Sequence, residues 1–182
     1  DAAGNESAAT TFSITVDTFI LPPVITGVTD DTTPLTGPIV DGGVTNDTTP
    51  TFTGTVEAGA TLTVSVNGST AIPVAVTGSG WTFTSSAPLP NGTHTFAFVA
   101  TDAAGNVSGP TTFNLTVDTV ILPPVIISVT DTTSPVTGAI ADGGVTNDTT
   151  PTFAGTVEAG ATLTISVNGG AATPVTVTGS DR

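Results

Sequence analysis

The sequence predicts an all-β protein made of tandem β-sandwich domains, and three observations support this prediction. First, apolar and polar residues alternate along short segments, which is the period-2 pattern of half-buried strands. Second, these segments are rich in Thr and Val, and Gly, Pro and Asn separate them, as expected for strands joined by turns. Third, the sequence repeats itself at a fixed interval of 101 residues.

The internal repeat is read directly from the chain. Residues 1–5, Asp-Ala-Ala-Gly-Asn, return as residues 102–106, and residues 15–18 return as 116–119, so both pairs are offset by 101. Over the 63 aligned positions from 19/120 to 81/182, 47 are identical. This period is longer than the 20–50 residues typical of solenoids, so each repeat should be a whole domain.

The strands of the complete copy follow one another with turn chemistry between them. Alternating apolar positions are Val24, Ile25 and Val28; Phe52 and Val56; Leu62, Val64 and Val66; Ile72, Val74 and Val76; Trp81 and Phe83; Phe96, Phe98 and Ala100; and Phe113, Leu115 and Val117. Turn residues occupy 58–60, 67–68, 78–80, 90–92 and 103–106. About seven strands in roughly 100 residues, with no crossover helix, predict an immunoglobulin-like Greek-key sandwich.

The register of the repeat places the domain borders. Residues 1–18 are predicted to be the C-terminal strand of a preceding repeat, residues 19–118 a complete domain, and residues 119–182 the N-terminal part of the next. Pro123 and Pro124 lie just after the second border, where prolines stiffen a linker and cannot donate to a sheet. The third segment lacks the counterparts of residues 82–101, which supply most of one strand and all of another.

Composition excludes several classes of function. One basic residue, Arg182, faces fifteen acidic ones, and the formal net charge is −14, so nucleic acid is not expected as a partner. With no cysteine, neither disulfides nor thiolate metal sites can form. No apolar run approaches the roughly 20 residues that span a bilayer, so we expect no membrane span in this segment.

Catalysis is not expected either. The chain has no Cys, Tyr or Lys and a single histidine, and its carboxylates fall in turns rather than in a predicted pocket. That histidine, His94, has no second His or Cys with which to bind zinc. We expect it to be a strand-edge residue.

The turns bring acidic residues together at one end of the complete domain. Successive antiparallel strands alternate in direction, so the loops that carry Glu57 and Asp102, together with the incoming Asp17, should converge on the end that faces the preceding domain. Asn106 lies in the same loop as Asp102 and is a weaker candidate ligand. Carboxylate oxygens without basic partners are suitable ligands for Ca²⁺. The alternative is a solvated acidic rim with no ion.

A second acidic set should gather at the opposite end, near Asp118. It consists of Asp30, Asp31, Asp41 and Asp47, and the next copy repeats three of its members as Asp131, Asp142 and Asp148. Asp31 becomes Thr132 in that copy, so its carboxylate is not needed in every repeat. Asn46-Asp47 before Thr-Thr-Pro reads equally well as an Asx turn, and we favour the turn over a metal site here.

Several ordered motifs carry a resemblance to a known family. They are Thr15-Val-Asp-Thr, Gly42-Gly-Val-Thr-Asn-Asp-Thr-Thr-Pro, Gly54-Thr-Val-Glu-Ala-Gly-Ala-Thr-Leu, Gly80-Trp-Thr-Phe, Pro90-Asn-Gly-Thr-His and Ala100-Thr-Asp-Ala-Ala-Gly-Asn. The chain resembles the bacterial Ig-like repeats of giant biofilm-associated (Bap-type) and type I-secreted adhesins. That resemblance implies calcium at domain junctions, with Asp17, Glu57 and Asp102 as ligands at the first and Asp118 and Glu158 at the second. The third acid of the second junction would fall outside the chain.

Two functions from different classes follow. One is an extender repeat of a bacterial cell-surface adhesin, which supports cell adhesion and biofilm formation while other domains contact host surfaces, abiotic surfaces or other cells. Its partners within the chain would be the neighbouring Ig-like repeats, and its location extracellular. The other is a repeat that itself binds glycan or self-associates as a biofilm matrix component. Near-identical successive copies favour the extender, because a stalk needs only length.

Overall fold

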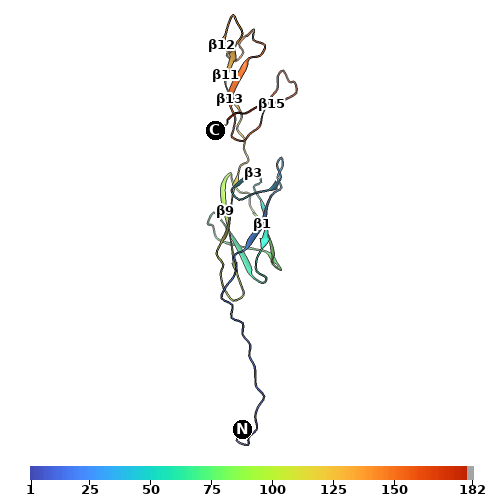
Figure 1. The fold of residues 1–182 in the computed structure, drawn as a ribbon, viewed down its shortest axis with the longest axis vertical. Helices are drawn as coiled ribbons and strands as arrows, with labels where there is room; N and C mark the ends of the chain where they lie inside the picture. Colours follow the sequence, from blue (N-terminus) through green and yellow to red (C-terminus); the bar gives the residue numbers. More distant parts are fainter. Residues whose placement is uncertain (180–182) are drawn as a thin grey trace. The chain divides into compact units, whose positions relative to one another are not determined.

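The computed structural model describes residues 1–179, which fall into two units: unit 1, residues 1–119, and unit 2, which begins at residue 120. The described residues form fifteen strands and no helix (Figure 1), so the all-β prediction is confirmed. Because the described residues form no helix, they include no helix that could cross a membrane.

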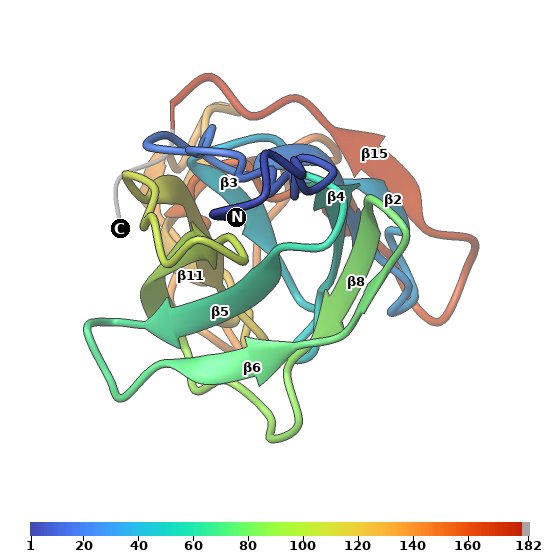
Figure 2. The same ribbon diagram turned by 90° about the horizontal axis from the view of Figure 1, so that it is seen from below.

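Unit 1 is a sandwich of two five-stranded sheets. The first sheet has the order β2-β1-β4-β8-β7, with β1 (Val24–Asp30), β2 (Gly37–Pro38), β4 (Thr51–Thr55), β7 (Val76–Thr77) and β8 (Gly80–Thr84). The second has the order β3-β10-β9-β5-β6, with β3 (Gly43–Thr45), β5 (Thr61–Val66), β6 (Ile72–Val74), β9 (Gly92–Thr101) and β10 (Thr111–Val117). All pairs are antiparallel except β3 with β10. In Figure 2, β5 and β6 lie on one side of the sandwich, and β4 and β8 on the other.

Aromatic side chains fill the space between the two sheets. Phe52, Phe96 and Phe98 have no exposed surface, and the ring centroids of Phe52 and Phe96 are 4.4 Å apart. Trp81 stacks on Phe98 at 4.7 Å. The predicted inward positions on β4, β5, β8, β9 and β10 are thus buried, Val66 partly, because alternate side chains of a strand point to the same face.

Two of the predicted core positions are exposed. Val24, at the start of β1, is 55% exposed, and Ile72, at the start of β6, is 42% exposed. β6 is an edge strand of its sheet, so its side chains have strand neighbours on one side only. Alternation alone does not distinguish an edge strand from a central one.

The predicted count of about seven strands was too low, because the sheets contain additional strands of two or three residues. The segment expected to form one strand from Ile72 to Val76 is in fact divided at Ala75. Its first half, β6, pairs with β5 in one sheet, and its second half, β7, pairs with β8 in the other. A strand that changes sheets in this way closes one side of a sandwich.

The expectation that His94 is a strand-edge residue was wrong. His94 lies within β9, opposite Leu115 of β10, and is only 5% exposed. β9 lies between β10 and β5 in its sheet, and its pairing with β5 ends at Phe96, so His94 is a buried residue near one end of a central strand.

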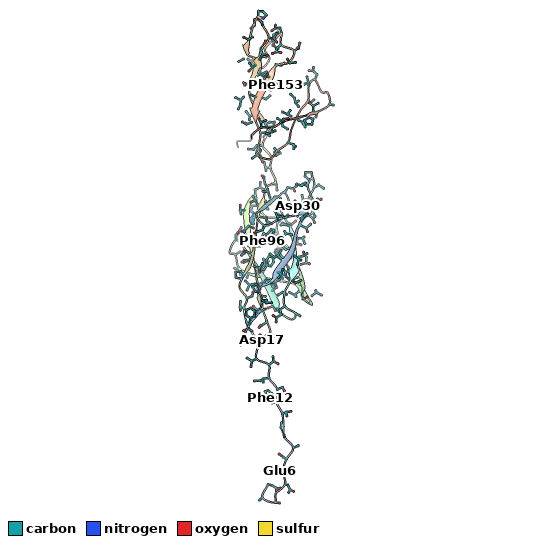
Figure 3. All side chains as sticks on the ribbon, in the orientation of Figure 1. Glu6, Phe12, Asp17, Asp30, Phe96 and Phe153 are labelled. Atoms are coloured by element: carbon teal, nitrogen blue, oxygen red, sulfur yellow. The ribbon has the colours of Figure 1, made fainter. Side chains whose placement is uncertain are left out.

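Unit 2 repeats the first part of unit 1. β11 (Val125–Asp131), β12 (Gly138–Ala139) and β13 (Thr152–Thr156) form a three-stranded sheet, each 101 residues after β1, β2 and β4, and β14 (Leu163–Ile165) pairs with β15 (Thr173–Val175). Phe153, labelled in Figure 3, is 51% exposed although its counterpart Phe52 is fully buried. The rings that cover Phe52 come from residues 83–113, and the described part of unit 2 has no counterpart of them.

Residues 1–18 form no strand. Phe12, Ile14 and Val16 are 74–90% exposed, and Figure 3 labels Phe12 on this segment. Residues 10–16, Thr-Thr-Phe-Ser-Ile-Thr-Val, align with β10, Thr-Thr-Phe-Asn-Leu-Thr-Val, at the repeat offset. Their assignment to a preceding repeat stays a prediction, as do the borders at residues 18/19 and 118/119. Residues 180–182 of the third predicted segment lie outside the described residues.

Candidate metal centre

Two loops and one incoming segment meet at one end of unit 1. Glu57 lies in the connection between β4 and β5, directly after the buried Val56. The N–H of Ala60 donates to the carbonyl oxygen of Glu57 at 3.1 Å, which closes a tight turn with Gly59 at a φ of 86°. A side chain would disfavour this φ, so glycine suits the position. The turn leaves the Glu57 carboxylate exposed.

Asp102 follows β9 and organises the loop that leads to β10. Its Oδ1 accepts hydrogen bonds from the backbone N–H groups of Ala104 at 2.9 Å and Asn106 at 2.8 Å. Its Oδ2 accepts one from the side-chain Nδ2 of Asn106 at 2.7 Å. These bonds, led by that from the Asn106 side chain, lower the pKa of Asp102 below its ordinary value of 3.8. The carboxylate is therefore ionised at neutral pH.

Asn106 also holds the incoming chain. Its Nδ2 donates a second hydrogen bond, to the carbonyl oxygen of Asp17 at 3.2 Å. The Asn106 amide thus joins Asp17 to Asp102. The sequence predicted Asn106 only as a weaker metal ligand and did not predict this bridging role. Residues 1–5 contain the same loop, in which Asn5 donates to Asp1. The spacing Asp-x-x-x-Asn therefore predicts the hydrogen bonds within the loop. It does not predict the bond from Asn106 to the incoming residue Asp17.

The three carboxylates predicted for the first junction lie together. One carboxylate oxygen from each of Asp17, Glu57 and Asp102 lies within 4.8 Å of the others. Small residues line the hollow around them, namely Ala58, Gly59, Ala60, Ala103 and Ala104. Figure 3 shows Asp17 at one end of unit 1 and Asp30 at the other, with Phe96 in the core between them.

The donor set fits a hard cation. Ca²⁺ binds carboxylate oxygens at about 2.3–2.6 Å, so two oxygens on opposite sides of one ion are roughly 5 Å apart. Oxygens within 4.8 Å of one another can therefore share a single ion. Residues 1–179 contain no Lys or Arg, so no side-chain ion pair with these residues offsets the mutual repulsion of the three carboxylates.

The acidic residues at the opposite end make a hydrogen-bonded network. Oδ1 of Asp47 accepts from the N–H of Thr49 at 2.8 Å, and Oδ1 of Asp30 accepts from the N–H of Thr32 at 2.8 Å. Oδ2 of Asp30 accepts from the hydroxyl of Thr45, and Oδ2 of Asp47 accepts from the N–H of Asp31. A carboxylate bound to the N–H two residues later is the geometry of an Asx turn. These bonds account for the burial of Asp30 and Asp47.

Other residues proposed at this end are engaged as well. Oδ1 of Asp41 accepts from the N–H of Asn114 at 2.6 Å, and the N–H of Asp118 donates to the carbonyl of Thr45 at 2.8 Å. In unit 2, Oε2 of Glu158 accepts from the N–H of Leu122 at 3.0 Å. Asp118 belongs to unit 1 and Glu158 to unit 2, so a second junction site that combines them remains a prediction.

Unit 2 repeats the Asx-turn network around Asp131 and Asp148. The N–H groups of Thr132 and Thr150 each donate to Asp148 at 2.8 Å and lower the pKa of its carboxyl to about 2, from an ordinary 3.8. Because the pKa is lowered, Asp148 contributes stability above pH 4, and this contribution is lost as the pH falls from about 4 to about 2.

The titration of Asp148 can be observed at its two donors. We expect the backbone amide resonances of Thr132 and Thr150 to shift together with a midpoint near pH 2, because their hydrogen bonds weaken when the carboxylate takes up a proton. NMR spectra recorded between pH 5 and the onset of unfolding measure this. Asp148→Asn is the control, in which the shifts should be absent. A midpoint near 4 in the native chain would contradict the network.

Comparison with known protein families agrees with the sandwich of unit 1. A family model described as a bacterial Ig-like domain matches residues 24–119, just over half of the chain. The match begins with β1 and ends two residues after β10. No curated protein matches the chain.

Proposed function

The chain belongs to the bacterial Ig-like domain family, and on this premise we propose that it is an extender repeat of a Bap-type bacterial cell-surface adhesin, which supports cell adhesion and biofilm formation. Bacterial Ig-like domains commonly occur in extracellular and surface proteins, which supports a location outside the cell. The role is mechanical and not catalytic. In each sandwich domain the chain enters at one end and leaves at the other, so a domain adds to the length of a stalk. Repeating the domain increases that length in proportion.

Calcium at the domain junction is the second part of the proposal, and one observation carries it: the carboxylates of Asp17, Glu57 and Asp102 come within 4.8 Å of one another. The incoming chain supplies the first, and two loops of the sandwich supply the others. Residues 1–179 contain no Lys or Arg that could neutralise these carboxylates, and a bound ion would supply the positive charge. It would thereby tie the incoming segment to the domain and restrict its direction.

Calcium should therefore raise the melting temperature of unit 1, and Glu57→Gln should abolish most of that increase. Ligand present at 100 times its Kd stabilises the folded state by about 2.7 kcal/mol. Glu57 is the preferred site of substitution because its carboxylate makes no hydrogen bond within the described residues, so the apo fold should tolerate the amide. Fluorescence of Trp81, the only tryptophan, reports the melting of unit 1 with and without calcium.

The double variant Glu57→Gln/Asp102→Asn should behave like the chelated native chain. Its matched control is Glu6→Gln/Asp142→Asn, which changes the formal charge equally, from −14 to −12, at two exposed residues outside the group. If calcium stabilises both double variants to the same extent, or stabilises none of the chains, the proposed site is wrong. Equal effects of magnesium and calcium would indicate general screening and not a site.

Stiffening is tested separately, on a chain of several complete repeats. Small-angle scattering should give a larger maximum dimension with calcium than with chelator, because each junction bends less when its carboxylates are bridged. An unchanged dimension would remove the stiffening claim while leaving ion binding intact. A rise in mass with calcium would instead favour the alternative function, in which the repeats associate with one another.

A further inference from the structure

His94 is a buried titratable side chain to which neither the fold nor the proposed calcium site assigns a role. Its Nε2 lies 2.8 Å from the carbonyl oxygen of Pro90, and its Nδ1 lies 3.0 Å from Nδ2 of Asn67. A carbonyl oxygen only accepts hydrogen bonds, so Nε2 must carry the proton and donate. Nδ1 then carries the lone pair and accepts a hydrogen bond from the Asn67 amide.

The orientation of Asn67 is fixed by the backbone of β9. Its Oδ1 accepts a hydrogen bond from the N–H of Thr95 at 2.8 Å, and its own N–H donates to the carbonyl of Thr95 at 2.8 Å. Turning the amide over would set Nδ2 against the Thr95 N–H, which is also a donor. The Asn67 NH₂ group therefore has to face His94.

These contacts are complete only for a neutral imidazole. A proton added at Nδ1 would place an N–H donor opposite the NH₂ donor of Asn67, and neither orientation of that amide removes the conflict. The side chain is 5% exposed, so water cannot readily replace the lost contact. Protonation thus costs the folded state a hydrogen bond that the unfolded chain does not need.

The contact between His94 and Pro90 is connected to the C-terminal end of unit 1. Pro90, which accepts the bond from His94, precedes Asn91, whose Oδ1 accepts bonds from the hydroxyl of Thr119 at 2.8 Å and from its N–H at 3.3 Å. Thr119 is the last residue of unit 1. The imidazole therefore supports the turn that holds the outgoing chain.

We propose that His94 is an acid-sensitive latch: neutral, it ties the Asn67 turn to the 90–92 turn, and protonated, it keeps its bond to Pro90 but releases Asn67. Loss of the His94 contact would loosen the turn at residues 67–68, where Asn67 also binds the backbone of Thr95.

Few charged groups surround the imidazole. Among the elements that adjoin it, β5, its turn at 67–68, β10 and the segment 85–91 contain no titratable residue. The nearby acids are Asp118, directly after β10, and Asp47, in the connection that meets Leu89 through Thr48. Both oxygens of Asp47 already accept hydrogen bonds, and both imidazole nitrogens are occupied by Asn67 and Pro90. Neutral dipoles therefore hold the imidazole.

Denaturant unfolding of the full chain between pH 7.5 and 5.5 tests the latch, with chelator present to remove any contribution from calcium and Trp81 fluorescence as the readout for unit 1. The unfolding equilibrium constant should rise about tenfold in total as the pH falls, since one proton allows at most a tenfold change per pH unit. In His94→Gln, whose amide can still donate and accept but does not titrate, the rise should be below twofold. An equal rise in both chains would overturn the proposal, as would a flat profile in the native chain.

Asn67→Asp provides a test of opposite sign. A carboxylate oxygen would then face Nδ1, so protonation of His94 would add a charged hydrogen bond, and acid should stabilise unit 1 or leave it unchanged. Acid destabilisation as large as that of the native chain would refute the latch even if His94→Gln failed to fold.

NMR observes the latch in the folded state. Because the chain has one histidine, its imidazole nitrogen resonances are unambiguous and should show the tautomer protonated at Nε2. The backbone amide of Thr95, which donates to Asn67, should shift together with the imidazole. The Nδ1-protonated tautomer, or a Thr95 amide that does not respond to the pH, would contradict the proposal.

Discussion

Replacing Phe98 by Ala should lower the free energy of unfolding of unit 1 by roughly 3–5 kcal/mol, the range for truncating a fully buried phenylalanine. Phe98 has no exposed surface and stacks on Trp81 at 4.7 Å, and it also meets Phe52 at 5.6 Å. The substitution removes a ring that touches both sheets and leaves a cavity between them. A loss of this size is a large part of the 5–15 kcal/mol that stabilises an ordinary domain.

Thermal melting followed by Trp81 fluorescence measures the effect, and a decrease of more than about 10 °C is expected for a domain of roughly 100 residues. Val99→Ala is the matched control, because Val99 is the next residue of β9, points to the other face and is only partly buried. It should shift the melting temperature much less. A shift of one or two degrees for Phe98→Ala would mean that this ring is not part of the core.

The second large effect is expected for Gly54→Ala, which adds a single methyl group. A Cβ at residue 54 would lie 2.1 Å from the carbonyl oxygen of Val24 and 2.3 Å from the Trp81 ring. One of these neighbours is backbone and the other is a buried ring, so neither can move aside cheaply. Overpacking usually costs 1–3 kcal/mol, and we expect about 3 kcal/mol here because β1 must separate from β4.

Gly80→Ala is the control for this substitution. Gly80 lies on β8, opposite Thr55 of β4, and a Cβ there would meet its nearest neighbour, the Thr77 carbonyl oxygen, at an ordinary 3.7 Å. Urea unfolding should therefore give nearly the native midpoint for Gly80→Ala and a clearly lower one for Gly54→Ala. Equal midpoints would show that the approach of β1 to Gly54 is not tight.

Local periodicity was enough to predict the longer strands and most of the core. Phe96, Phe98 and Ala100 alternate with polar residues along β9, and burial of one face follows directly from that alternation. The convergence of Asp17, Glu57 and Asp102 was also predictable, because loops that follow alternate strands of an antiparallel sandwich emerge at the same end. Both inferences need only the order of the strands.

Features that depend on contacts between distant residues were decided by the tertiary structure. His94 looks like an isolated polar residue in the sequence, and only the approach of Asn67 and Pro90 makes its burial possible. The division of residues 72–76 between two sheets likewise has no local signal. The local sequence pattern allows several strand pairings and side-chain environments for these residues. Packing of side chains between the two sheets decides which of them forms. For this reason the sequence determined the longer strands and the acidic end, and the tertiary structure alone determined the short strands and the environment of His94.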